Sequence, residues 1–195
     1  MKLLVTGGAG YIGSYIIKNF DKVDEIKEIT SLDNLFFNQN FYNKSSKIKN
    51  VKGDVRDKSL MNKLYKSHDI IIPLAALVGA PLCKKYPNET EEINFHAIDD
   101  MCKEISKSQI VIMPVSNSGY GIGEKDKFCD EKSPLNPISL YGKTKVEAEK
   151  VIMQRSNSVS FRLATVFGVS DRMRIDLLVN NFTYIAFFKK YLEVF

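Results

Sequence analysis

Tyr141 and Lys145 are the residues whose types and spacing point most directly to chemistry. They lie four positions apart in segment 137–154, where the spacing of apolar residues predicts a helix, so both side chains are expected on one face. A neighbouring ammonium group stabilises a phenolate, and the pKa of Tyr141 is therefore expected well below its usual value of about 10. A tyrosine of this kind exchanges protons near neutral pH. The alternative is a surface tyrosine beside a solvated lysine.

Ser116 follows segment 109–115, an apolar run that predicts a strand. Sheets whose strands alternate with helices bind ligands at the carboxyl ends of the strands, which is where Ser116 is expected. Its hydroxyl is suited to orient the oxygen of a substrate alcohol or carbonyl. Ser116, Tyr141 and Lys145 together therefore predict an acid–base site.

A glycine-rich segment, residues 7–13, directly follows a short apolar strand and opens a predicted helix. This is the context in which a dinucleotide-binding turn occurs. Gly7 permits the tight turn, Gly10 lets the backbone approach a pyrophosphate, and Gly13 allows the helix to pack closely on the strand. The amino end of the helix adds partial positive charge. The segment therefore favours a dinucleotide cofactor over an ordinary turn before a helix.

Asp33 lies twenty residues beyond Gly13, at the end of the predicted strand 26–32. A carboxylate at this place accepts hydrogen bonds from the adenosine ribose hydroxyls and repels a 2′-phosphate. No arginine follows it that would receive such a phosphate. Asp33 therefore favours NAD over NADP, although a turn formed by Asp33 and Asn34 at the strand end is the simpler alternative.

Strands and helices are predicted to alternate along the chain, and these elements must position the residues above. Alternation of this kind indicates an α/β fold with a doubly wound, mostly parallel sheet. Asn88, with Glu91 three residues later, is expected to cap one of the helices. The predicted strands are 2–6, 26–32, 48–52, 69–76, 109–115 and 159–167, with a strand-like end at 191–195, and the predicted helices are 11–19, 57–66, 88–107, 137–154 and 173–189.

Composition limits the classes of protein and of partner. The chain has 195 residues, 44% hydrophobic and 26% charged, enough for one globular domain or for one and a piece of another. A net charge of +5 is modest for a nucleic-acid-binding protein. The longest nearly apolar run, 70–83, is too short to cross a membrane. Three scattered cysteines and two histidines show no metal-binding spacing, so we expect a cytoplasmic protein without a metal site.

The motifs occur in the order that one known family shows. The chain resembles the extended short-chain dehydrogenase/reductases, and among them the NAD-dependent epimerase/dehydratase family, which acts on nucleotide sugars. This resemblance implies a Rossmann-type NAD-binding fold, NAD as the cofactor and a nucleotide sugar as the substrate. The segments that carry it are Thr6–Gly13, Gly53–Asp57, Leu74–Ala76, Ser116–Gly121 and Tyr141–Lys145.

The resemblance assigns cofactor contacts to residues at matching positions. Asp54 and Val55 are expected to meet the adenine. Residues 74–76 are expected to line the pocket beside the ribose and the nicotinamide, although they also suit the core of the sheet. The full set of expected cofactor-binding residues is Gly7, Gly10, Tyr11, Ile12, Gly13, Asp33, Asn34, Asp54, Val55, Leu74, Ala75, Ala76, Tyr141 and Lys145.

The resemblance also assigns catalytic and substrate contacts. Tyr141 is expected to take the proton of a sugar hydroxyl while Ser116 steadies the oxygen, and Lys145 is expected to lower the pKa of Tyr141. Thr165 and Arg172 are weaker candidates for contact with the substrate. Asn94, which is placed to tie a helix to the active-site strand, and Arg174, which is placed to meet a diphosphate, suit structural or surface positions equally well.

The predicted function is epimerisation of a nucleotide sugar through a transient keto intermediate, with a UDP sugar and carbon 4 favoured. Asn117 and Ser118 stand where the sugar 4,6-dehydratases of the family carry an Asp–Glu pair, so dehydration is the less favoured activity. Two alternatives remain open. One is a nucleotide-sugar dehydrogenase or reductase that releases its keto product, and the other is an NAD-binding module without catalysis.

Family members continue into a C-terminal lobe that completes the sugar site, and we expect residues 1–168 to form the NAD-binding domain and residues 169–195 to begin a truncated lobe. Segment 175–188 carries a broad apolar stripe. An exposed apolar patch of this kind favours association. The sequence therefore predicts NAD binding, poor turnover, and a homodimer or other self-association.

Overall fold

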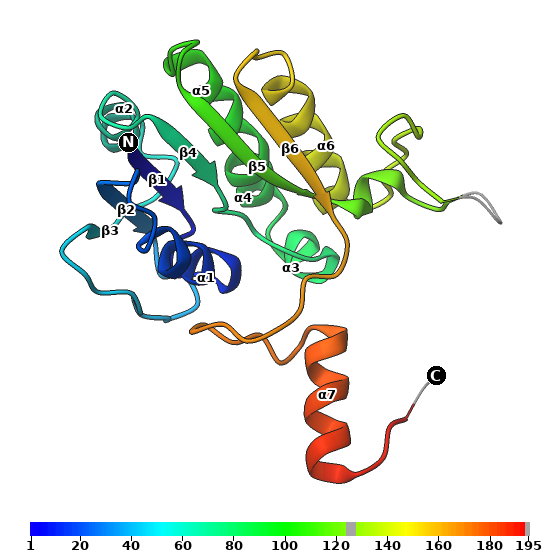
Figure 1. Cartoon of the computed structure of the whole chain (residues 1–195). Coiled ribbons are helices and arrows are strands. Elements are labelled where there is room, and N and C mark those ends of the chain that lie inside the picture. The colour runs from blue at the N-terminus through cyan, green and yellow to red at the C-terminus, as the bar shows by residue number, and fades with distance from the viewer. Residues whose placement is uncertain (124–127, 194–195) are drawn as a thin grey trace.

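The computed structural model of the chain describes residues 1–123 and 128–193, and a six-stranded sheet runs through its centre (Figure 1). All five pairs of neighbouring strands are parallel, which confirms the doubly wound α/β fold. The strand order is β3-β2-β1-β4-β5-β6, and it reverses direction between β1 and β4, where such sheets open a crevice for ligands. The strands are β1 (Lys2–Thr6), β2 (Glu28–Asp33), β3 (Ile48–Lys52), β4 (Ile70–Pro73), β5 (Ile110–Ser116) and β6 (Ser158–Leu163).

Helices cover both faces of this sheet. Helices α2, α5 and α6 pack on one face, and α1 packs on the other. The helices are α1 (Tyr11–Phe20), α2 (Lys58–Tyr65), α3 (Ala80–Lys85), α4 (Pro87–Glu91), the π-helical segment η1 (Glu92–His96), α5 (Ala97–Glu104), the 3-10 turn η2 (Asn117–Tyr120), α6 (Leu140–Ile152) and α7 (Leu178–Lys189). None of the described helices is long and apolar enough to cross a membrane.

Alternating side chains of the central strands fill two core layers. Leu4 and Ile71 belong to the cluster formed with α2, α5 and α6, whereas Leu3 and Ile72 belong to the cluster formed with Ile17 of α1. Because successive residues of a strand point to opposite faces, a strand covered on both faces is apolar along its whole length. This explains why the central strands appear in the sequence as continuous apolar runs.

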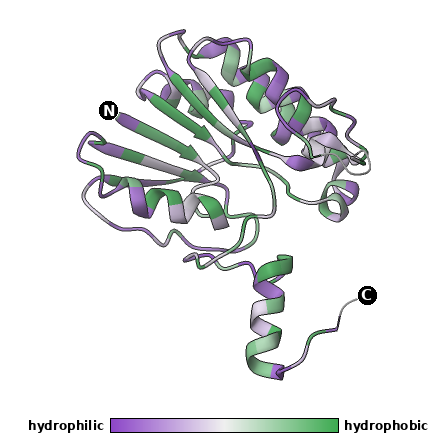
Figure 2. Cartoon of the chain, turned by 45° about the vertical axis from the view of Figure 1, so that its right-hand side comes forward, coloured by the Kyte–Doolittle hydropathy of each residue, from purple (hydrophilic) through white to green (hydrophobic). Residues whose placement is uncertain are grey.

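The far end of the sheet is less covered. β6 is an edge strand, and its Phe161 is half exposed. Beyond β6 the chain leaves the sheet, and α7 lies apart from the other helices (Figure 1). Figure 2 shows hydrophobic residues along this helix, and Asn180 is its one buried residue. The C-terminal helix is therefore held mainly through the segment that precedes it.

Several predicted boundaries are wrong. The strand predicted over 69–76 ends at Pro73, so residues 74–76 leave the sheet. The strand predicted over 159–167 ends at Leu163, and the last helix begins at Leu178 rather than at residue 173. Residues 191–193 form no strand, and residues 194–195 lie outside the described part of the chain. Apolar character continues past each strand because the residues beyond it line a cavity.

The region between β4 and β5 differs most from prediction. Asn88 does not cap a helix, because α4 begins one residue earlier at Pro87, whose fixed backbone and missing N–H suit the first helical turn. The predicted single helix 88–107 consists of α4, the π-helical segment η1 and α5. Helix α3 was not predicted at all. Its proline at the first turn was the available signal.

Candidate active site

One cavity of about 930 Å³ lies at the carboxyl ends of the strands. It reaches from the end of β2 to the first turn of α6. All of the residues predicted for cofactor, catalysis or substrate line it, so the fold brings together segments that are far apart in the sequence. Asn94 alone, among the softer candidates, is not part of the lining, whereas Arg174 is. The roles of the lining residues remain predictions.

In the turn between β1 and α1, glycines lie very close to neighbouring backbone atoms. Gly7 has a φ of +71°, and a Cβ added there would stand 2.7 Å from the backbone nitrogen of Ala75. A Cβ at Gly13 would stand 2.3 Å from the carbonyl oxygen of Gly7. At Gly10 the only atom within 4 Å of such a Cβ is the Gly7 carbonyl oxygen, at 3.0 Å. The turn therefore requires glycine at two positions and keeps the amino end of α1 open to a ligand.

Asp33 ends β2 and is only 8% exposed. Its Oδ2 accepts the backbone N–H of Ala9 at 3.1 Å, and its Oδ1 accepts the backbone N–H of Leu35 at 2.8 Å and the amide of Gln39 at 3.1 Å. Burial raises the pKa of Asp33, while these hydrogen bonds and the charge of Arg172 oppose that rise. Three of about four acceptor positions on the carboxylate are thus occupied, which leaves one for a ribose hydroxyl.

Asp54 follows β3. The side-chain amide of Asn34, the residue after Asp33, donates to Asp54 Oδ2 at 3.2 Å. Arg56 holds the Asp54 carboxylate with two hydrogen bonds, from Nε at 2.9 Å and from a terminal nitrogen at 2.8 Å. The hydrogen bonds from Arg56 lower the pKa of Asp54 to about 2. Arg56 also contacts Glu92 of η1. Arg56 had not been singled out as the partner of this carboxylate, although it lies within the motif 53–57.

Ser116 and Tyr141 meet at the other end of the cavity. Ser116 ends β5, accepts the backbone N–H of Ser118 at 3.1 Å and donates to the Ser118 hydroxyl at 2.9 Å. Tyr141 lies in the first turn of α6, which Ser139 caps by accepting the N–H of Gly142 at 3.1 Å. The cap fixes the start of the helix and hence the place of the tyrosine.

The expected low pKa of Tyr141 is wrong for this structure. Burial raises the pKa of the Tyr141 hydroxyl, while contact with Ser116 and the charge of Arg174 act in the opposite direction. Lys145 is itself buried, and the loss of solvent lowers its pKa to about 8. Both residues lie in α6 and line the cavity, but the reasoning from helix spacing left out that both groups lose water, and the charge of Lys145 is not among those that act on Tyr141.

Residues 74–79 form the wall between these two ends, and Asn94 fixes them. Its amide oxygen accepts the backbone N–H of Leu77 and its amide nitrogen donates to the Leu77 carbonyl, both at 2.9 Å. The thiol of Cys83 donates to the same carbonyl at 3.3 Å. Asn94 therefore ties a helical segment to the chain beyond β4, as the sequence suggested. The π-helical turn that carries it is of a kind frequent at functional sites.

Residues 168–176, which we call the strap, run along one face of α1. The Tyr11 hydroxyl donates to the Gly168 carbonyl at 2.6 Å, and the Ser170 hydroxyl lies 3.0 Å from that of Ser14. Lys18 pairs with Asp171 at 3.1 Å. Tyr11, Ser14 and Lys18 follow one another at helical spacing, which identifies a polar face of α1 that the sequence analysis overlooked.

The strap carries two arginines to different parts of the cavity. Arg172 packs over the ring of Phe37, with the guanidinium carbon 5.4 Å from the ring centroid, on the side where Asp33 lies. Arg174 is held by the carboxylate of Asp176, and its charge acts on Tyr141. The spacing of Arg172 and Arg174 in the sequence did not indicate that they have different neighbours, because these neighbours depend on where the strap crosses α1.

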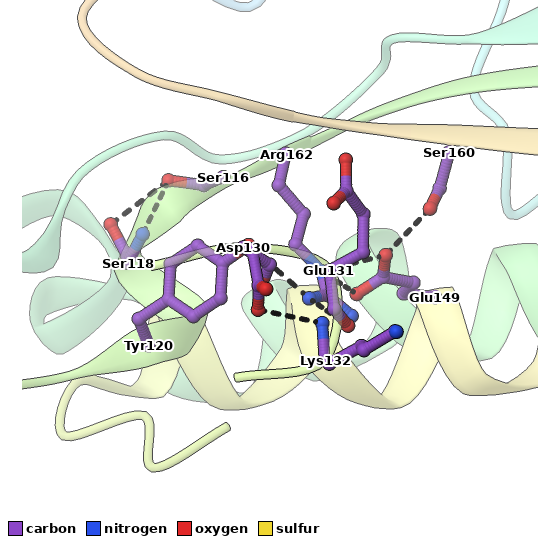
Figure 3. A network of polar contacts seen from close by, with 9 residues as sticks. All are labelled: Ser116, Ser118, Tyr120, Asp130, Glu131, Lys132, Glu149, Ser160 and Arg162. Atoms are coloured by element: carbon purple, nitrogen blue, oxygen red, sulfur yellow. Dashed lines mark hydrogen bonds and ion pairs between the residues drawn. The ribbon is translucent and has the colours of Figure 1, made fainter. Parts of the chain in front are cut away.

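A polar network holds α6 against the edge strand (Figure 3). The Nε of Arg162 in β6 donates to both carboxylate oxygens of Glu149 in α6, each at 3.0 Å, and Ser160 donates to Glu149 at 2.5 Å. Arg162 also reaches the hydroxyl of Tyr120 at 3.3 Å. Because Glu149 is four residues beyond Lys145, this pair fixes the helix that carries Tyr141 and Lys145. Sequence analysis had not identified this network.

Comparison with known proteins adds three findings. A sequence model of the NAD dependent epimerase/dehydratase family matches residues 3–185. The UDP-glucose 4-epimerase of Lactobacillus helveticus is 29% identical over 178 residues, which are 87% of this chain and 52% of that protein. The 3 beta-hydroxysteroid dehydrogenase/Delta 5-->4-isomerase of Vaccinia virus (strain Ankara) is 28% identical over 169 residues, which are 84% of this chain and 49% of that protein. The chain thus spans about half the length of these relatives.

Among solved structures, the UDP-glucuronic acid 4-epimerase from Bacillus cereus in complex with NAD is similar, with a TM-score of 0.77 and 24% sequence identity. The likeness covers 95% of this chain and 62% of that chain. At this identity the likeness concerns the fold alone.

Proposed function

We propose that this chain, which belongs to the NAD-dependent epimerase/dehydratase family, carries the cofactor site and the acid–base group for epimerisation of a nucleotide sugar, at carbon 4 of a UDP sugar. The family's dependence on NAD confirms the cofactor that the motifs had indicated. The substrate and the carbon atom are the new part of the proposal. Its support is the single cavity that joins the glycine turn and Asp33 to Ser116 and Tyr141.

The residues of the cavity fit NAD. The open side of Gly10 and the amino end of α1 suit a pyrophosphate, and the remaining acceptor position of Asp33 suits a ribose hydroxyl. We assign the adenine to the wall formed by Asp54 and Val55, and the nicotinamide ribose to Tyr141 and Lys145. When bound, NAD accepts a hydride from the sugar carbon and returns it to the other face.

In the proposed reaction Tyr141 takes the proton of the sugar hydroxyl and later gives it back. Burial raises its pKa, so the phenolate that accepts this proton is the minor form at neutral pH, and the protonated tyrosine formed in this step is the acid that gives the proton back. Ionisation for the first step is favoured by Ser116 and by the charge of Arg174. Ser116 has one hydroxyl proton, so it must turn from Ser118 toward the substrate oxygen to stabilise it.

Epimerisation is favoured over dehydration because Asn117 and Ser118 carry no carboxyl group. Loss of a sugar hydroxyl needs an acid for the leaving group and a base for the neighbouring carbon. Both residues line the cavity, but Ser118 is engaged with Ser116, and Asn117 is exposed. A second candidate is oxidation or reduction with release of a keto product, which the dehydrogenase named among the relatives favours. A catalytically inactive NAD-binding module is the third.

We further propose that residues 1–168 form the cofactor domain and that residues 169–195 begin a second lobe that completes the sugar site. Ser170 and Asp171 bond to α1, which ties the first residues of that lobe to the cofactor turn. In this arrangement Thr165 and the part of the strap that carries Arg174 border the sugar. The chain spans about half the length of the relatives named above.

The test is product analysis of the chain with NAD and UDP sugars, together with the variant Tyr141→Phe. An epimerase converts the sugar without net accumulation of reduced cofactor, whereas a dehydrogenase accumulates it. Removal of the hydroxyl should lower the rate of sugar conversion by about 10²- to 10⁴-fold. Tyr15→Phe, at an exposed position on α1, is the matched control. Unchanged conversion by Tyr141→Phe would reject the assignment, and reduced cofactor as the main product would favour the second candidate.

A further inference from the structure

Arg172 lies at the end of the cavity that belongs to the adenosine half of the proposed cofactor site. Its neighbours are Phe37 and Asp33, in and before the loop that follows β2. Ser116 ends β5, three strands away from β2, and a strand spacing of about 4.8 Å separates the two ends by about 14 Å. Arg172 itself contacts the loop after β2 and its charge acts on Asp33, and also on Asp176 of the strap, whereas sequence analysis had associated it with the substrate.

The position of Arg172 is fixed by the residues before it. Ser170 donates to the carbonyl of Tyr11 at 2.6 Å, and Asp171 pairs with Lys18. The guanidinium group then rests on the face of the Phe37 ring, which leaves the edge that carries its N–H donors free to meet a ligand. Within residues 1–123 and 128–193, no acceptor takes a hydrogen bond from this guanidinium group.

Asp33 alone would exclude a phosphate on the adenosine ribose by charge repulsion. In the folded chain its charge is opposed by two backbone N–H groups, by Gln39 and by Arg172. A 2′-phosphate near Asp33 would therefore meet a carboxylate whose charge is already partly balanced. It would also meet the planar guanidinium group of Arg172, which has five N–H donors. Sequence reasoning excluded a phosphate-binding arginine because it considered only the residues that follow β2.

We propose that Arg172 forms a subsite for the 2′-phosphate of NADP, so that the chain binds both NAD and NADP. This inference rests on the proposed placement of the cofactor but not on the proposed reaction. NAD remains the tighter ligand, because Asp33 still accepts a ribose hydroxyl. The difference between the two affinities is smaller than the carboxylate alone would produce.

Calorimetric titration of NAD and NADP into the full chain and its variants tests the subsite. Arg172→Gln should weaken NADP binding by roughly tenfold or more, the size of a charge-assisted hydrogen-bonded contact. NAD binding should change by less than about fivefold, because NAD has no 2′-phosphate and feels only the weak, screened charge of Arg172. Arg172→Lys should lie between, because an ammonium group keeps the charge but not the planar fork. The NAD affinity of each variant also shows that it is folded.

Arg174→Gln is the matched control, since it removes the same type of charge from the other part of the strap. It should leave the ratio of NADP to NAD affinity unchanged. A second arm compares 2′-AMP with 5′-AMP, and only 2′-AMP should respond to Arg172→Gln. Equal losses for NAD and NADP in Arg172→Gln, or a wild-type chain that does not bind NADP, would overturn the subsite. A wild-type chain that binds neither cofactor would overturn the proposed function as well.

Discussion

Helix α6 lines the cavity, and α7 begins directly after Leu177, the last lining residue, yet the two helices are held in opposite ways. α6 has thirteen residues and buries Gly142, Thr144, Lys145, Val146, Ala148, Glu149 and Ile152. α7 has twelve residues and buries only Asn180. Ala148 and Ile152 belong to the main apolar cluster, whereas α7 is tied to the body through hydrogen bonds of a single amide.

The difference shows that an apolar stripe in the sequence does not identify the surface on which it packs. The stripe predicted in the last helix exists, and Leu178 and Phe187 are 59% and 66% exposed. The apolar residues of α6 have comparable character but meet the sheet. Elements with few buried apolar contacts open locally at low free-energy cost, so the acid–base helix is expected to be rigid and α7 adaptable. Self-association through α7 stays a prediction.

The largest test of this comparison is truncation of one aliphatic side chain on each helix. Ile152 is fully buried, and Ile152→Ala should lower the free energy of unfolding by about 2–5 kcal/mol through lost burial and a cavity. Leu178→Ala, at an exposed position of α7, should change it by less than about 0.5 kcal/mol. Urea denaturation measures both. Similar losses for the two variants would show that α7 is as firmly packed as α6.

The same contrast explains what the sequence could predict. The strands β1 and β3 were predicted with their observed bounds, and β5 within one residue, because β1 and β5 are nearly continuous apolar runs and β3 is followed by Gly53 and Asp54. The glycine turn and Asp33 were found because each has a chemical reason at its own position. Asp54, Val55 and residues 74–76 were named from the family resemblance, and the cavity includes them as well.

What failed depends on neighbours that are distant in the sequence. The direction of the Tyr141 pKa shift is decided by burial under the rest of the site, and the place of Arg172 by bonds between the strap and α1. Residues 74–76 look like strand, yet they leave the sheet to line the cavity. The pair formed by Glu149 and Arg162 joins segments whose approach only the fold reveals.

A second test concerns the buried lysine of α6. A pKa lowered from 10.5 to about 8 corresponds to about 3 kcal/mol of stability lost by burying the charged group. Lys145→Met should therefore raise the free energy of unfolding at pH 7, by up to about 3 kcal/mol. Between pH 8 and 10.5 the unfolded state holds more protons than the native state, so the stability of the parent should rise with pH and the gap should close.

Lys143→Met, at an exposed position of the same helix, is the control and should shift stability by less than about 0.5 kcal/mol at any pH. Denaturation curves collected across this pH range supply the comparison. If Lys145→Met is less stable than the parent at pH 7, the lysine is held by favourable contacts and its lowered pKa is wrong. In that case a buried polar side chain would stabilise α6, as Asn180 does for α7.

The third test, with the smallest expected effect on overall stability apart from the controls, concerns Asn180. This polar residue is the one buried residue of α7, whereas α6 buries several apolar ones. Its amide oxygen accepts the N–H of Gly168 at 2.9 Å, and its amide nitrogen donates to the Tyr11 hydroxyl at 3.0 Å and to the Arg174 carbonyl at 2.9 Å. In Asn180→Ala these partners can turn to water, because the surrounding strap is only partly buried. The free energy of unfolding should therefore fall by only about 1 kcal/mol.

The local effect of Asn180→Ala should be larger than the global one. Amide hydrogen exchange in the strap and in α7 should become faster by about tenfold, which corresponds to about 1.4 kcal/mol, while exchange in α6 stays unchanged. Asn181→Ala removes a neighbouring amide of the same size and should alter neither region. Because Asn180 is the one buried residue of α7, its loss detaches the helix without disturbing the core. Faster exchange throughout α6 in Asn180→Ala would instead show that the two helices unfold as one unit.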